Sequence, residues 1–305
     1  MGKQAILAFF ICLATFPAFS QGCSDAGGCT IGYMKNTLQP DSAYQSAFIA
    51  GVSAGLGEQD VLIISPFLEA NFKVLKNTWL NFRTPFVFTS GNLGSTADVG
   101  DLFAGVTQRV WETEEADLRV MATIKIPQNQ ADKKDDDRLP LPMPYQSSLG
   151  TTDLIVGVSY KRNRILVSAA YQHVLKQNNQ NGFLTDLDPE NLNYQAYFNS
   201  QNLERANDVL LRAEYTMPVG NHLLSVGVLP VYHLSEDTYQ NLAGERVKAK
   251  GSDGLTLNIT GNYLYKLSNR AGLRFTAGAP VITRDVRPDG LTRFAVGVVN
   301  YELLF

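Results

Sequence analysis

Apolar side chains recur at every second position along most of the chain from residue 45 onward. Residues 255–267 show the pattern most clearly, because Leu257 and Ile259 alternate with Asn258 and Thr260. An amphipathic helix would instead repeat its apolar positions every three to four residues. The alternation therefore predicts extended strands with one apolar and one polar face.

Twelve segments with this pattern are expected to form strands. They cover residues 45–56, 60–74, 77–90, 100–111, 115–127, 152–161, 163–176, 207–217, 221–234, 253–266, 270–283 and 291–305. Most are longer than the roughly 5–6 residues of a typical globular strand, and they reach the roughly 9–11 residues that a tilted membrane-spanning strand needs.

The connections between these segments alternate in length. Tight turns are expected near residues 76–77, 161–163, 218–221 and 267–270, whereas residues 128–149, 177–206 and 235–252 form long joins. Short turns at one rim and long loops at the other are typical of outer-membrane β-barrels. We therefore predict an all-β, up-and-down antiparallel transmembrane barrel of about 12 strands over residues 45–305, with both termini on the periplasmic side.

Alternation alone also fits a secreted β-sandwich, whose apolar face is a dry core. Aromatic residues favour the barrel, because they gather near strand ends on the apolar face, as interfacial girdles do. Phe72, Tyr160, Tyr215, Tyr265 and Tyr301 lie toward the short turns, and Phe88, Tyr171 and Tyr232 toward the long loops.

The end of the chain carries a second indication of a barrel. Residues 299–305 alternate in hydrophobicity and close on Phe305. This resembles the C-terminal signal of outer-membrane barrels. The resemblance implies two partners, the barrel-assembly machinery, which would read the last strand, and outer-membrane lipid.

The first 20 residues have the features of a secretory signal peptide. Lys3 precedes an apolar stretch over residues 5–16, and residues 18–20 fit a signal-peptidase site. Export to the outer membrane follows. Residues 21–44 would then form an N-terminal periplasmic extension or a plug in the lumen. Cys23 and Cys29 are candidates for a small-loop disulfide in an oxidising compartment, with lipidation of Cys23 as the alternative.

Composition excludes several other classes of protein. The 305-residue chain is 45% hydrophobic and 18% charged, with a formal net charge of -3. It lacks a basic surface that would track phosphates, so no nucleic-acid partner is expected. Three cysteines and three histidines are too few for a disulfide-rich scaffold or a multi-metal site, and no metal or cofactor is implied.

A short motif recurs along the chain. Residues 101–106 (DLFAGV) return as residues 153–158 (DLIVGV), and Gly150 completes a Gly-x-x-Asp-Leu-x-x-Gly-Val pattern. It resembles a repeated element of outer-membrane proteins assigned to the uptake of aromatic compounds, the phenol-degradation group, which is related in kind to long-chain fatty-acid channels. The same residues also suit a simple structural role, with Asp starting a strand and Gly allowing close packing.

The polar face of each strand predicts what lines the lumen. We expect few large aliphatic side chains there. The lumen-lining candidates are Glu69, Lys73, Arg83, Arg119, Lys125, Arg212, Glu214, Arg274 and Glu302. Cations outnumber anions in this set, which favours anionic or carboxylate-bearing solutes. The alternative is that Arg and Glu on neighbouring strands pair and pack the interior shut.

Two functions from different classes follow. The first is an outer-membrane channel for passive uptake of small organic solutes, aromatic or anionic. The second is a structural or interaction subunit of an outer-membrane complex, with a closed lumen. No enzymatic activity is expected: His233 and Ser235 resemble the His-x-Ser pair of outer-membrane phospholipase, but they are predicted to face the lumen rather than the lipid.

Overall fold

The computed structural model describes residues 46–291 and 293–305. The predicted signal peptide (1–20), the extension or plug (21–44) and the candidate disulfide between Cys23 and Cys29 lie outside the described residues and stay predictions.

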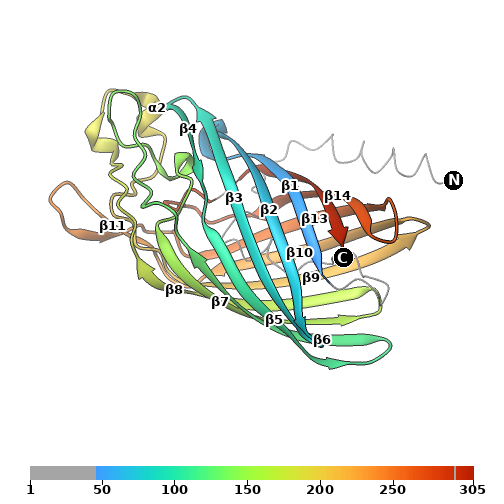
Figure 1. The fold of residues 1–305 in the computed structure, drawn as a ribbon. Coiled ribbons are helices and arrows are strands. Elements are labelled where there is room, and N and C mark those ends of the chain that lie inside the picture. Colours follow the sequence, from blue (N-terminus) through green and yellow to red (C-terminus); the bar gives the residue numbers. More distant parts are fainter. Residues whose placement is uncertain (1–45, 292) are drawn as a thin grey trace.

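Within the described residues, twelve long antiparallel strands close into a barrel (Figure 1). They are β1 Ala47–Leu56, β2 Leu62–Leu75, β3 Thr78–Gly91, β5 Leu102–Glu112, β6 Ala116–Ile126, β7 Thr151–Arg162, β8 Ile165–Gln177, β9 Asp208–Val219, β10 His222–His233, β13 Gly254–Lys266, β14 Ala271–Ile282 and β15 Ala295–Leu304. Each pairs with its neighbours in sequence, which confirms the predicted up-and-down topology.

Pairing between the first and last strands closes the ring. β1 and β15 pair from Ala47 opposite Leu304 to Leu56 opposite Ala295. Backbone hydrogen bonds of 3.0 Å in both directions between Ser46 and Phe305 extend this seam. The seam therefore ends at the rim that carries the short turns, which is the periplasmic rim in proteins of this architecture.

Smaller elements lie mostly at the opposite rim, with α2 and β11 at the left of Figure 1. They are the strands β4 Gly94–Val99, β11 Thr238–Gln240 and β12 Arg246–Lys248, the 3-10 turns η3 Glu58–Asp60, η4 Met143–Tyr145 and η5 Thr185–Leu187, and the short helix α2 Leu192–Gln195. In the part of the chain that the structure describes, no helix has the length and apolar character needed to span a membrane.

The two faces of the wall differ as predicted. Apolar side chains such as Leu68, Leu211 and Ile259 are exposed on the outside. All eight predicted girdle aromatics are exposed there as well. Polar side chains such as Asn81 and Asn258 are instead buried inside. An apolar exterior around a polar interior is the arrangement of a barrel in an outer membrane.

The interior is less polar than predicted. A cluster of buried apolar side chains spans β5 to β10, namely Phe103, Met121, Ile155, Ala170, Leu210, Leu229 and Val231. The expectation of few large apolar groups in the lumen is therefore wrong. Several of these strands carry apolar residues on both faces, so alternation alone does not mark their inward side chains as part of a core.

The loops of the long-loop rim form a cap with its own core. Phe183, Tyr194 and Tyr197 from residues 178–207 pack on Leu141 and Tyr145 from residues 127–150.

The last predicted strand starts later than expected, at Ala295 rather than residue 291. Leu291 instead packs against a small apolar cluster of the cap.

Candidate functional site

The predicted lumen residues lie inside the barrel at different depths. Six of the nine are buried: Glu69, Lys125, Arg212, Glu214, Arg274 and Glu302. Lys73, Arg83 and Arg119 are half-buried. Whether these side chains line a conducting path is not decided by their burial, and that part of the assignment stays a prediction.

Three arginines on different strands pair with three glutamates. Arg83 Nη1 lies 3.3 Å from Glu69 Oε2, Arg212 Nη2 lies 2.7 Å from Glu214 Oε2, and Arg274 Nε lies 2.5 Å from Glu302 Oε1. On β9 the glutamate follows its arginine toward the short turn, and Glu302 is opposite Gly272, also nearer that turn than Arg274. Two of the three glutamates therefore lie on the periplasmic side of their arginines.

A cavity of about 210 Å³ lies inside the barrel, and the arginines of these three pairs are among its lining residues. Its apolar patch consists of Ile63, Phe67, Pro85, Val87 and Phe103. Its charged lining groups are the cations Arg83, Lys125, Arg212, Arg274 and Arg293 and the carboxylates Asp101 and Asp289. Five cations thus line the cavity against two carboxylates, although Arg83, Arg212 and Arg274 are each also paired with a glutamate. An apolar patch beside guanidinium groups suits a solute with an apolar body and an anionic head.

The two aspartates of the repeated motif hold the same lysine. Lys125 Nζ on β6 lies 2.7 Å from Asp153 Oδ2 and 3.5 Å from Asp101 Oδ2. Both motif glycines allow close packing: a Cβ on Gly105 would lie 2.4 Å from Thr123 Oγ1 on β6, and one on Gly157 would lie 3.0 Å from the Ala169 carbonyl oxygen on β8 and 3.1 Å from Met121 Cε on β6. These contacts give the motif a structural role in packing β5 and β7 against β6.

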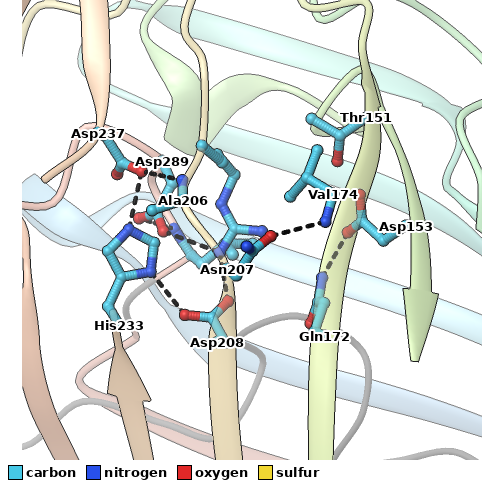
Figure 2. A network of polar contacts seen from close by, with 12 residues as sticks. Thr151, Asp153, Gln172, Val174, Ala206, Asn207, Asp208, His233, Asp237 and Asp289 are labelled. Carbon is cyan, nitrogen blue, oxygen red and sulfur yellow. Dashed lines mark hydrogen bonds and ion pairs between the residues drawn. The ribbon is translucent and has the colours of Figure 1, made fainter. Parts of the chain in front are cut away.

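A second buried charge network ties the loops together at the long-loop end of the cavity. Figure 2 shows His233 between two carboxylates, with Nδ1 2.6 Å from Asp208 and Nε2 2.8 Å from Asp237. Arg205 Nη2 lies 3.0 Å from Asp208 and 3.4 Å from Asp289. Sequence analysis missed this network, because Asp208 and His233 at strand ends meet Arg205, Asp237 and Asp289 from separate loops.

The ion pairs of this network set the charge of its loop residues. Burial disfavours the charged form of Asp289, but Arg284 and Arg205 outweigh burial and hold the pKa of Asp289 below its usual range. Burial likewise opposes the charge of Arg205, whereas Asp208 and Asp289 raise the pKa of its guanidinium. Both groups are therefore ionised at neutral pH.

The same contacts bear on the His-x-Ser comparison. Two carboxylate acceptors require an N–H on each ring nitrogen of His233, so neither nitrogen is available to take a proton from a serine. His233 is buried inside the barrel, as predicted, whereas Ser235 is exposed. This arrangement does not form a nucleophile–base pair.

A group of cations surrounds one tryptophan near the short-turn rim. Lys73 Nζ lies 5.6 Å from the centre of the Trp79 ring, and the guanidinium carbons of Arg109 and Arg119 lie 5.4 and 5.5 Å from it. Such distances allow cation–π attraction. The predicted residues Lys73 and Arg119 thus meet here, around the Trp79 ring.

Comparison with solved structures finds outer-membrane proteins of similar fold. A crystal structure of an outer membrane channel from Pseudomonas putida F1 matches with a TM-score of 0.60 and 13% identity, over 88% of this chain and 100% of that chain. A NanC porin matches with a TM-score of 0.47, 8% identity and coverage of 86% and 99%, and a CymD monoaromatic hydrocarbon channel with 0.44, 10%, 95% and 99%. No family model and no curated sequence matches the chain. At these identities, the first likeness establishes the fold.

Proposed function

We propose that this protein is an outer-membrane channel that lets small organic solutes, anionic or aromatic, cross passively. The observation that carries the proposal is the cavity inside the closed barrel, with its apolar patch and its excess of cations over carboxylates. Arg274 illustrates how a solute would bind: it directs Nε and Nη2 toward Glu302, and a guanidinium has five N–H donors in all. A solute carboxylate could share that guanidinium while its apolar body lies against Phe67 and Phe103.

Two further parts of the proposal rest on sequence. The repeated Asp-Leu motif supports a relation to the aromatic-compound uptake group. The C-terminal strand β15 pairs with β1 along the seam, and Phe305 follows it. We propose this strand as the segment that the barrel-assembly machinery reads. Replacing Phe305 by Ala should slow insertion into the outer membrane without changing the fold of the molecules that do insert.

The alternative is a barrel whose lumen is closed and whose loops serve partner proteins. The interior ion pairs and the cap favour it, because both fill space that a wide channel would leave to water. Planar-bilayer recordings separate the two functions. The channel predicts conductance that small organic anions such as benzoate reduce or carry, whereas the closed barrel predicts silence with every ion and solute.

Charge reversal tests the lumen assignment. Arg274→Glu and Arg119→Glu should each shift the reversal potential in a salt gradient toward cation preference, because each exchanges a positive for a negative group beside the path. Lys248→Glu in the exposed β11–β12 hairpin makes the same charge change outside the lumen and should leave selectivity unaltered. Equal selectivity in all the variants would remove these arginines from the path.

A further inference from the structure

The cavity is roofed by two chain segments that meet inside the barrel. Met143 to Leu149 come from the β6–β7 loop, and Asp289 to Leu291 come from the β14–β15 loop. Gly290 is the point of contact: its φ is +62°, and a Cβ there would lie 2.5 Å from the Pro144 nitrogen. The two segments therefore close the roof by direct backbone approach.

The first segment is anchored by an apolar core. Leu141 and Tyr145 pack with Phe183, Tyr194 and Tyr197, and the Tyr194 hydroxyl donates to the Pro140 carbonyl at 2.9 Å. Full burial of each large apolar side chain contributes roughly 1.5–3 kcal/mol. Releasing residues 139–149 into water would expose several such groups at once, so this part of the roof is fixed.

The second segment, residues 283–291, is anchored largely by charged side chains, and Leu291 packs against the cluster that contains Met143 and Leu149. Asp289 accepts from Arg284 Nη2 at 2.9 Å and lies 3.4 Å from Arg205 Nη2, and Arg287 Nε donates to Glu58 at 2.7 Å. Backbone hydrogen bonds join Val286 to Gly251 within the segment and Phe294 to Leu56 beyond it. Desolvation offsets most of the attraction within a buried ion pair, so this anchoring favours the docked state much less than an apolar core does.

From this contrast we propose that residues 283–291 are the extracellular gate of the cavity and that Asp289 is its latch. The segment leaves the roof while residues 139–149 stay docked, and the wall remains closed because β14 keeps its pairing with both β13 and β15. Removing the Asp289 charge leaves Arg205 and Arg284 buried without this partner, which favours release. The inference rests on the proposed channel function, and it adds the element that opens the path.

Cysteine labelling tests the movement without relying on conductance. In full-length protein with Cys23 and Cys29 replaced by serine, Leu291→Cys reports on the gate and Leu141→Cys, in the apolar core of the cap, on the fixed roof. Asp289→Asn should raise the rate at which a membrane-impermeant maleimide labels Leu291→Cys several-fold and leave that of Leu141→Cys unchanged. Asp285→Asn removes an exposed carboxylate of the same loop and should change neither rate.

Conductance of the same variants tests what the movement does. Asp289→Asn should increase the open probability several-fold in planar bilayers, and a chain with residues 285–291 replaced by a short Gly-Ser linker should stay open. Heat-modifiable migration in gels checks that each barrel has folded.

Each other outcome overturns a defined part of the proposal. Unchanged labelling of Leu291→Cys, or an equal rise at Leu141→Cys, rejects the gate. A wild-type channel whose conductance equals that of Asp289→Asn and of the shortened loop also rejects the gate, but leaves the channel function intact. A shortened-loop barrel that is folded and silent rejects the channel function and the gate with it.

Discussion

At the scale of single residues, buried charges of the cap link stability to pH. Glu58 lies in η3, in the connection between β1 and β2, where its side chain is buried beside Arg287. Burial raises the pKa of its carboxyl to about 7, although Arg287 acts in the opposite direction. The folded state therefore binds a proton at Glu58 more tightly than the unfolded state does.

The sign of the pH effect follows from this raised pKa. The contribution of Glu58 to stability is complete below its unfolded pKa of 4.5 and is lost as pH rises through about 7. A shift of this size corresponds to about 3 kcal/mol, as an order of magnitude. Wild-type protein should thus become less stable between about pH 5 and about pH 8, measured as the denaturant midpoint in detergent micelles.

Glu58→Gln is the matched variant for this measurement, because glutamine has the shape of the protonated acid and does not titrate. The variant should show a flatter dependence of midpoint on pH over the same range. Parallel curves for the wild type and the variant would mean that Glu58 titrates normally in the folded protein.

Sequence predicted which side chains face inward but not which of them meet. Glu69 and Arg83 could be placed on one face because strand parity is local. Lys125 was placed there too, whereas its contact with both motif aspartates was not foreseen. The network around His233 had no sequence signal beyond inward parity, because Arg205, Asp237 and Asp289 come from irregular loops whose paths are set by long-range packing.

At the scale of elements, close approach of strands makes some glycines irreplaceable. Gly51 on β1 faces inward, and a Cβ there would lie 2.6 Å from Asn300 Cβ and 2.7 Å from the Phe67 ring. The Arg83 guanidinium lies over the Phe67 ring, with its carbon 3.8 Å from the ring centre. A methyl group at residue 51 would therefore disturb the apolar patch of the cavity as well as the strand seam.

Gly51→Ala should lower the free energy of unfolding by about 1–3 kcal/mol, the usual range for overpacking. Gly297→Ala on the paired strand β15 is the control, since its Cβ would have no neighbour within 4 Å. The measurement is the denaturant midpoint of both refolded variants. Equal midpoints would contradict the close approach at the β1–β15 seam.

Strand positions were predicted within a few residues, but the short elements were not. Long alternating runs such as residues 253–266 carry many independent matches to a period of two, and β13 covers Gly254–Lys266. β4, β11 and β12 are too short to show a period. The start of β15 was predicted four residues early, because Leu291 continues an apolar pattern that tertiary packing assigns to the cap.

At the scale of the whole molecule, apolar side chains with similar exposed fractions lie in different surroundings, lipid or water. Ile259 in the middle of β13 and Leu242 in the β11–β12 hairpin are both exposed, at 51% and 62%. Ile259 lies in the apolar belt, whereas Leu242 lies beyond the long-loop rim. The first side chain faces lipid and the second faces water.

Ile259→Arg should destabilise the barrel in lipid vesicles by about 2–4 kcal/mol, the cost of an arginine near the bilayer midplane. Leu242→Arg should have little effect, because its side chain is already in water. Reversible unfolding in vesicles, followed by tryptophan fluorescence, gives both values. A tolerated Ile259→Arg would overturn the assignment of the outer face to lipid.

The sequence by itself predicted about 12 strands, their order around the wall and the face that each presents to lipid. Alternation is a local property, and a slip of one residue would turn a whole apolar face inward. Tertiary structure decided how the lumen is filled: Arg287 meets Glu58 across 229 residues of chain, and Gly290 meets Pro144. Such contacts depend on where loops of irregular backbone return in space, and no periodic pattern encodes that path.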